Sequence, residues 1–319
     1  MIRESLKPLS TSVSVRMVNS RYGLPYHINL EATTKCNLDC RQCGRSKLEA
    51  GSRDSDMTYE LFSSIIDSLG YPTKHVNIIG LGEPLLNVQI FQMIEYTKKR
   101  GFDVSMTDNF TLIDEKVSLS LIDLHLDYLY ASFDSVSKVE FEKIRTGASF
   151  DRVLENIKRV MKNKRRMQAG KPKVYFKTTI SKENYSEIPD LVKLAEKLGL
   201  NGIDFAKQIS QDEGYVNDPT FQLDPKILPK TDIEIVPCEM GNYPCQGLIG
   251  CFVTFDGKVM PCDHVIQILP REDFSRFQVG DLNNNTITKI WRSPQYRKVR
   301  KGLASGQYLP FCKKCPACR

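Results

Sequence analysis

The sequence predicts an α/β protein that begins with an incomplete barrel of parallel strands and ends with a small cysteine-rich domain. Strand-like and helix-like segments alternate from residue 27 to residue 206, as expected for successive βαβ units. Six such units are present, whereas a complete barrel of this kind has eight. The ten cysteines of the 319-residue chain all lie outside residues 44–237, which separates a short N-terminal group from a larger C-terminal one.

Each predicted strand of the barrel is a short segment with apolar or alternating side chains. The strands are expected at 27–31, 75–79, 102–106, 128–133, 174–180 and 202–206. The helices have apolar residues at helical spacing, and they are expected at 58–69, 90–99, 114–124, 138–144, 150–162 and 188–198. Thr58 is expected to cap the first helix, and Gly101 and Gly199 to end the second and the last.

The alternation ends after residue 206, and prolines and polar residues occupy the next segment, which we interpret as a linker or a lid loop. In the C-terminal part, Asp256-Gly257 predicts a hairpin turn inside 251–259, and a helix is expected near 286–300. The chain is therefore divided into an N-terminal extension (1–26), a barrel (27–206), a linker (207–237) and a cysteine-rich hairpin and helix domain (238–319).

The net charge of +7, from 45 Lys and Arg against 38 Asp and Glu, is mild. The densest basic run, 162–173, is either a solvated helix end or a docking patch for an acidic electron donor or an anionic substrate. It has no interleaved aromatic residues, so no nucleic-acid partner is predicted. No N-terminal segment resembles a signal peptide, and no window has the roughly 18 apolar residues that a membrane span needs. We therefore expect a cytoplasmic protein without a membrane partner.

Because a reducing cytoplasm disfavours structural disulfides, the ten thiols indicate metal ligation. The N-terminal three, Cys36, Cys40 and Cys43, have the spacing CxxxCxxC directly after the first strand. Three thiolate ligands leave one iron of a four-iron cluster without a protein ligand, and an open position is what a catalytic metal needs. The alternatives are a three-cysteine zinc site and a chance group of thiols.

With this motif at the end of a barrel strand, the chain resembles the radical S-adenosylmethionine (radical SAM) superfamily, which has a partial, TIM-like (β/α)6 barrel. The resemblance implies that a 4Fe–4S cluster binds S-adenosylmethionine (SAM) and cleaves it to methionine and a 5′-deoxyadenosyl radical. It also implies that this radical abstracts hydrogen from a substrate and that a flavodoxin- or ferredoxin-type partner supplies the electron.

Further residues match positions of that family one at a time. Gly80, Gly82 and Glu83 belong to a segment that resembles the GGEP element, in which Glu83 and the strand-end backbone would meet the methionine amino group of SAM. Ser132 and Asp134 end the fourth strand at a position that often contacts the ribose of SAM in relatives. Lys177 lies where relatives often place a polar group near the methionine carboxylate. The alternative for each polar residue is a loop acid or a strand-end cap.

Two other segments extend or depart from the family pattern. Residues 106–109 replace the Thr-Asn-Gly of many relatives, which draws attention to Asp108 and Asn109 as cofactor or substrate contacts. Residues 144–156 resemble members that carry a C-terminal domain with an auxiliary cluster.

Four C-terminal thiols form a second pattern. The predicted hairpin brings Cys245 and Cys262 together, and the tail motif Cys312-Lys-Lys-Cys315 would complete a four-thiolate site. Such a site can hold zinc or a 4Fe–4S cluster. The resemblance to the Twitch version of the SPASM domain, as in 2-deoxy-scyllo-inosamine dehydrogenase-type enzymes, implies a second, auxiliary 4Fe–4S cluster. The cysteines left over are Cys238, Cys251 and Cys318, and Cys238 or Cys318 could replace one of these ligands.

The position of Cys251 on the hairpin strand allows two interpretations. It is either a small core residue or a catalytic thiol that returns a hydrogen atom to a substrate radical, as in radical epimerases. Three enzyme functions follow: oxidation of a hydroxyl- or amine-bearing carbon of a small polar substrate with the auxiliary cluster as electron acceptor, epimerisation with Cys251 as hydrogen donor, and modification of a peptide. The non-enzymatic alternative is a structural zinc protein. The sequence identifies neither the substrate nor the oligomeric state.

Overall fold

The structure is a computed structural model, and it describes residues 23–48, 52–207, 223–236, 245–269, 271–307, 309–310 and 312. The predicted N-terminal extension therefore lies almost entirely outside the described part, as do Cys238, Cys315 and Cys318.

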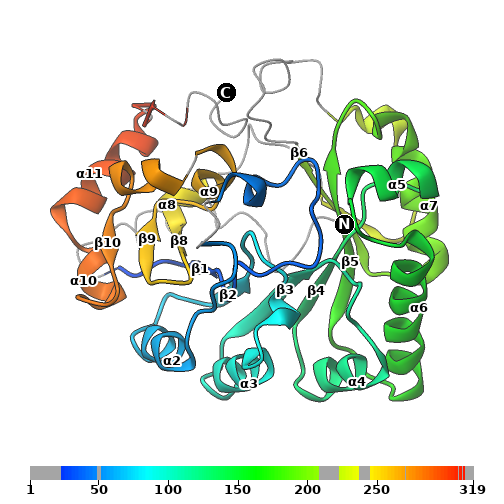
Figure 1. Cartoon of the computed structure of the whole chain (residues 1–319), viewed down its shortest axis with the longest axis horizontal. Helices are drawn as coiled ribbons and strands as arrows, with labels where there is room; N and C mark the ends of the chain where they lie inside the picture. Colours follow the sequence, from blue (N-terminus) through cyan, green and yellow to red (C-terminus); the bar gives the residue numbers. More distant parts are fainter. Residues whose placement is uncertain are drawn as a thin grey trace.

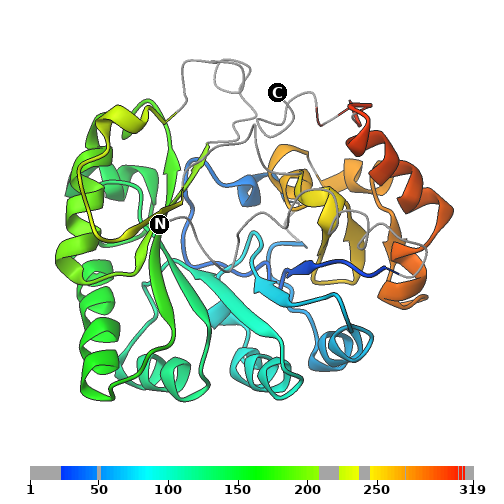
Figure 2. The same cartoon turned by 180° about the vertical axis from the view of Figure 1, so that it is seen from behind.

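The described strands form a single ten-stranded sheet with the order β10-β9-β8-β1-β2-β3-β4-β5-β6-β7. Strands β1 to β8 run parallel to their neighbours, and only the pairs β8–β9 and β9–β10 are antiparallel. Figures 1 and 2 show the sheet as an open arc rather than a closed barrel, which confirms the predicted partial barrel. The strands are β1 (His27–Leu30), β2 (His75–Ile78), β3 (Asp103–Asp108), β4 (Tyr128–Ser132), β5 (Lys173–Ile180), β6 (Gly202–Lys207), β7 (Glu234–Val236), β8 (Gly250–Val253), β9 (Lys258–Met260) and β10 (Gly280–Asp281).

Six helices of the barrel cover the outside of this arc (Figure 1). Thr58 accepts a hydrogen bond from the backbone N–H of Leu61 and so caps the first of them, as predicted. Gly199 ends the last one in the left-handed conformation, with φ +76°, where a residue without Cβ is favoured. The helices are α2 (Tyr59–Asp67), α3 (Ile90–Lys99), α4 (Glu115–Asp123), α5 (Lys138–Ile144), α6 (Phe150–Arg166) and α7 (Ile188–Leu198).

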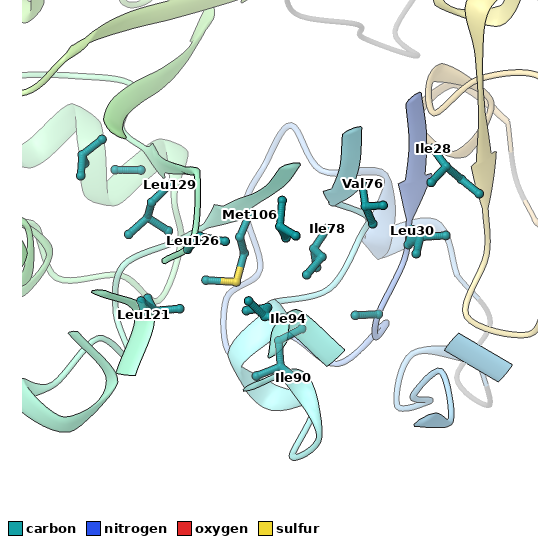
Figure 3. Packing of buried hydrophobic residues seen from close by; sticks show 14 of the residues in the cluster. Ile28, Leu30, Val76, Ile78, Ile90, Ile94, Met106, Leu121, Leu126 and Leu129 are labelled. Carbon is teal, nitrogen blue, oxygen red and sulfur yellow. The ribbon is translucent and has the colours of Figure 1, made fainter. Parts of the chain in front are cut away.

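The two faces of the sheet differ in polarity because successive side chains of a strand point to opposite faces. On the outer face, apolar residues such as Ile28, Val76 and Met106 pack against the helices, as Figure 3 shows for α3. On the inner face, Asn77 donates a hydrogen bond to Asn29 over 2.8 Å and accepts one from Ser105 over 2.5 Å. Across β1 to β3 the inner face is therefore polar, whereas the outer face is apolar.

The segment that was expected to be a linker contains a strand. Strand β7 (Glu234–Val236) pairs in parallel with β6 and adds a seventh strand to this edge of the sheet. A short 3-10 helix, Pro225–Ile227, precedes it. Strand β7 has only three residues, which is too few for a recognisable strand pattern in the sequence. The prolines at 225 and 229 make the segment resemble a loop.

The predicted hairpin exists as β8 and β9, and Gly257 adopts φ +83° in its turn. Its first strand also pairs in parallel with β1, so the sheet continues from the barrel into the C-terminal part without interruption. The predicted domain boundaries at 26, 206 and 237 stay predictions. The single helix expected near 286–300 is instead two helices, α10 (Ile287–Trp291) and α11 (Pro294–Ala304), because Ser293 caps a new helix that begins at Pro294.

The basic run 162–173 joins the end of α6 to the start of β5. It therefore lies at the end of the sheet where the parallel strands begin, whereas the cysteine loop follows the end of β1. Within the described residues, none of the helices combines the length and the apolar character needed to cross a membrane.

Candidate active site

The first three cysteines lie in the loop after β1, at the carboxyl ends of the parallel strands, where barrel enzymes place their active sites. All three thiols are partly buried, and burial raises the pKa of each. Each thiolate also raises the pKa of a neighbouring cysteine, so Cys36, Cys40 and Cys43 share one electrostatic environment. The positive charge of Arg145 acts in the opposite direction and partly offsets this rise in pKa at all three thiols.

This donor set fits an iron–sulfur cluster. Thiolates are the protein ligands of such clusters, and a nearby positive charge stabilises them in the ionised form that binds iron. Within the described part of the chain, no group of three His, Cys, Asp or Glu side chains is arranged around a single metal ion. The three cysteines would each hold a separate iron of a cubane.

The loop after β2 lies against the start of the cysteine loop, and its two glycines are required by this close approach. A Cβ on Gly82 would lie 2.7 Å from the carbonyl oxygen of Lys35 and closer still to that of Thr33. A Cβ on Gly80 would lie 2.7 Å from the side chain of Glu31. The backbone N–H of Glu83 donates a hydrogen bond to the carbonyl of Lys35 over 2.7 Å. We expected this loop to contact SAM, and it packs against the residues that lead into the cysteine motif.

The side chain of Glu83 is almost fully buried, with 2% of its surface exposed. Its carboxylate accepts hydrogen bonds from the backbone N–H groups of Asn109, over 2.8 Å, and Leu85, over 3.3 Å. Burial and the adjacent carboxyl of Asp108 raise the pKa of Glu83 well above its ordinary value. Burial likewise raises the pKa of Asp108. The two carboxyls therefore favour protonation more than free carboxyls do, and they join the loops after β2 and β3.

The polar residues expected on β4 and β5 occupy two different places. Ser132 and Lys177 are neighbours in register on the inner wall, where Lys177 forms an ion pair with Asp204 over 3.0 Å. Asp134 is fully buried, and it accepts hydrogen bonds from the backbone N–H of Thr179, over 2.8 Å, and from the guanidinium of Arg145, over 2.7 Å. Contacts of Ser132, Asp134 and Lys177 with SAM stay predictions, and the oxygens of Asp134 already have protein donors.

Three of the four predicted auxiliary ligands lie in one region of the structure. Cys262 and Cys312 belong to one buried apolar cluster on the inner side of β8, and Cys245 packs against it. Cys43 of the N-terminal loop packs against the same cluster. The following residue, Gly44, approaches helix α9 (His264–Ile268) so closely that a Cβ would lie 2.8 Å from the carbonyl oxygen of Ile266. The two cysteine groups are therefore neighbours in space, and Cys315 lies outside the described residues.

Cys251 points away from this site. It is in register with Ile28 on β1, and both side chains face the outer core together with Trp291 and Tyr296. Only 1% of its surface is exposed, and burial raises the pKa of its thiol to about 12. This placement agrees with a small core residue and does not favour the predicted role as a hydrogen-atom donor.

Two functional candidates were missed by sequence reasoning. Glu31 was assigned to the end of the first strand, but its buried carboxylate accepts hydrogen bonds from Leu81 and Phe255. Arg145 belongs to the segment 144–156 that matches the family pattern, and its positive charge acts on all three cysteines. The available signal was a charged residue at the end of an element: Glu31 directly follows the first strand, and Arg145 directly follows helix α5.

Residues 30–195 match the family described as the Radical SAM superfamily. This chain belongs to the radical SAM superfamily. Residues 245–316 match the SPASM domain, described as an iron–sulfur cluster-binding domain. As a member of this superfamily with a SPASM domain, the protein uses 4Fe–4S clusters and SAM as cofactors.

Curated relatives of the chain carry several different names. The tungsten-containing aldehyde ferredoxin oxidoreductase cofactor-modifying protein of Pyrococcus furiosus is 25% identical over 322 residues, covering 91% of this chain and 86% of the relative. The AdoMet-dependent heme synthase of Methanosarcina barkeri is 24% identical and covers 92% and 91%. A probable GTP 3′,8-cyclase of Methanococcus maripaludis is 31% identical and covers 77% and 87%. The chain is thus similar to proteins that are named for several different activities.

Solved structures support the fold. Streptococcus suis SuiB bound to its precursor peptide SuiA has a TM-score of 0.65 at 16% identity, covering 87% of this chain and 67% of SuiB. BtrN in complex with AdoMet and 2-DOIA has a TM-score of 0.53 at 16% identity, covering 92% of both chains. The resemblance to 2-deoxy-scyllo-inosamine dehydrogenase, which is BtrN, is therefore that of a distant structural neighbour.

Proposed function

We propose that this radical SAM protein oxidises a hydroxyl- or amine-bearing carbon of a small polar substrate, with the C-terminal cluster as electron acceptor. When bound, the cluster at Cys36, Cys40 and Cys43 and its SAM supply a 5′-deoxyadenosyl radical that abstracts a hydrogen atom. The substrate loses one hydrogen atom to the deoxyadenosyl group, one proton to a base and one electron to the second cluster. The product is a ketone or an imine.

The observation that carries this proposal is the proximity of the two cysteine groups. Cys43 packs against the same apolar cluster that contains Cys262 and Cys312, and β8 of the C-terminal part pairs directly with β1. An electron released by a substrate at the inner wall would therefore have a short path, through packed protein, to an iron–sulfur cluster at the C-terminal cysteines. A purely structural role for the C-terminal thiols would not need this proximity.

The inner wall supports a polar substrate. Tyr175 donates a hydrogen bond to Oε2 of Glu234 over 2.6 Å, and Oε1 of Glu234 is buried without a hydrogen-bond partner among the described residues. Glu234 is the first residue of β7 and is in register with Gly202, where a Cβ would lie 2.3 Å from the backbone carbonyl oxygen of Glu234.

The experiment uses anaerobically reconstituted protein and a panel of amino alcohols, polyols and short peptides that carry deuterium on carbon. Deuterium in 5′-deoxyadenosine identifies the substrate, and a product two mass units lighter than the undeuterated substrate identifies the oxidation. The double variant Cys262→Ala/Cys312→Ala should still cleave SAM but should form no oxidised product. The control is Cys36→Ala, which removes a proposed ligand of the first cluster. This variant should neither cleave SAM nor form product.

Full product formation by the double variant would contradict the proposal, because no electron acceptor would remain in the C-terminal part. Incorporation of solvent deuterium at one substrate carbon, with no change of oxidation state, would show an epimerase instead.

A peptide substrate is the second candidate. It is favoured by the likeness to SuiB, whose structure is that of a complex with the precursor peptide SuiA. The short peptides in the panel test it directly, since label transfer from a peptide and none from amino alcohols or polyols would replace the small-molecule proposal.

A further inference from the structure

The cysteine loop is held to the segment after α5 by two backbone hydrogen bonds. The N–H of Asp39 donates to the carbonyl of Thr146 over 2.9 Å, and the N–H of Arg41 donates to the carbonyl of Ile144 over 3.1 Å. Arg145 lies between these two acceptors. The backbone thus fixes the position of Arg145 relative to the loop, independently of its own side chain.

The guanidinium of Arg145 is held from its other side by Asp134, with 2.7 Å between Nη2 and Oδ2. Asp134 is itself immobilised, since it is fully buried and accepts hydrogen bonds from Thr179 and, over 3.2 Å, from Gln42. The side chain of Arg145 is 12% exposed. Its Nε is buried and has no hydrogen-bond partner among the described residues, although a buried guanidinium N–H ordinarily has one.

The positive charge of this guanidinium acts on all three thiols of the loop. Arg145 interacts favourably with the thiolates of Cys36, Cys40 and Cys43, and the carboxylate of Asp134 opposes that effect at Cys40. Arg45 is a second cation near Cys36 and Cys43, but its donors are engaged with the backbone carbonyls of Thr34 and Arg53. Arg145 therefore combines a fixed charge, a free N–H donor and proximity to all three thiols.

We propose that Arg145 is a positioning residue of the radical-generating cluster: its guanidinium, oriented by Asp134, holds a positive charge and an N–H donor against the cluster and raises its reduction potential. The inference rests on the proposed ligation of that cluster by Cys36, Cys40 and Cys43. The physical reason is that reduction adds a negative charge to the cluster, and a positive charge held nearby in partly desolvated surroundings stabilises the reduced form. Hydrogen bonds to cluster sulfurs act in the same direction.

The test compares Arg145→Gln with Arg159→Gln. Arg159 is a matched control because it is a partly buried arginine of α6 that bonds the carbonyl of Ile113, away from the cysteine loop. The reconstituted proteins are assayed for iron and sulfide, and the midpoint potential of the SAM-responsive cluster is measured by an EPR-monitored redox titration. For Arg145→Gln with full iron content, we expect a reduction equilibrium constant at least tenfold smaller, which is a shift of about 59 mV to more negative potential for a one-electron couple. Arg159→Gln should leave the potential unchanged.

Arg145→Lys guards against a variant that does not fold or does not load iron. Because lysine keeps the charge but not the planar donor, its potential should lie between those of the unsubstituted protein and Arg145→Gln. The second cluster of the same sample, which does not respond to SAM, should keep its potential.

Three outcomes would overturn the inference. The first is an unchanged potential in fully loaded Arg145→Gln. The second is weaker SAM binding without a change of potential, which would assign the guanidinium to SAM. The third is a SAM-responsive signal that persists in Cys43→Ala, which would refute the ligation itself and so identify a failure of the proposed function rather than of the role of Arg145.

Discussion

The carboxylate of Glu31 accepts a hydrogen bond from the backbone N–H of Phe255 over 3.3 Å, and this bond joins the barrel to the C-terminal hairpin. The other carboxylate oxygen accepts from the N–H of Leu81 over 3.2 Å, in the loop that contacts the cysteine loop. Only 1% of Glu31 is exposed. One buried acid directly after β1 therefore connects the two halves of the site.

Glu31→Gln should destabilise the protein and weaken this connection. The amide can accept only on one side, so a buried backbone N–H loses its partner, at a cost of about 1–3 kcal/mol. The free energy of unfolding, measured by urea denaturation under anaerobic conditions, checks this. The control is Glu95→Gln, which removes an exposed ion pair with Lys99 and should change stability by less than about 0.5 kcal/mol. Equal effects of the two substitutions would show that Glu31 is not a connecting residue.

The barrel was predictable from the sequence because its signals are local. Apolar spacing, the Thr58 cap and the Gly199 terminus act within a few residues, and the structure confirms them. The pairing of β8 with β1 joins residues more than 220 positions apart, and no local pattern specifies such a contact. The outward direction of Cys251 depends on that same register, so it could not be predicted without it.

The candidate site was predictable as a set of motifs but not as an electrostatic unit. The spacing of Cys36, Cys40 and Cys43 identifies them directly, because all three lie on one loop. The approach of Arg145 depends on the ion pair with Asp134 and on backbone bonds between two loops. Contacts of this kind arise only after the strands are assembled.

Gly82→Ala should disrupt the site. A Cβ at this position would overlap the carbonyl oxygens of Thr33 and Lys35, and backbone atoms at the start of the cysteine loop cannot move aside as a side chain can. We expect a loss of stability of about 2–3 kcal/mol and a loss of bound iron, measured by urea denaturation and iron analysis. Gly170→Ala is the control, since its Cβ would meet no atom within 4 Å. Normal iron content in Gly82→Ala would contradict the close packing described for this loop.

The Glu83–Asp108 pair predicts a dependence of stability on pH. Because both folded-state pKa values are raised, the folded protein keeps a proton that the unfolded chain releases above the ordinary values of 3.8 and 4.5. Stability should therefore fall as the pH rises through this range towards the raised pKa of Glu83, by up to about 1.4 kcal/mol per pH unit.

Asp108→Asn should flatten this dependence, because the amide removes one titrating group and the repulsion at Glu83 with it. Thermal unfolding between pH 5 and pH 8 measures the slope for both proteins, with the exposed Asp123→Asn as the control. The coupling of these two carboxyls would be refuted if the unsubstituted protein became more stable over this range or if both slopes were equal.

Cys43→Ala and Cys251→Ala should separate the two classes of cysteine. Cys43 is a proposed ligand beside the C-terminal group, so its substitution should remove the SAM-responsive cluster and abolish SAM cleavage. Cys251 faces the outer core, so its substitution should leave SAM cleavage and product formation intact and cost about 1 kcal/mol from the small cavity that remains. Product analysis, iron content and urea denaturation of the two variants decide this. If Cys251→Ala cleaved SAM but formed no product, the thiol would have to reach the substrate despite its burial, and the outward register of β8 would need to change during turnover.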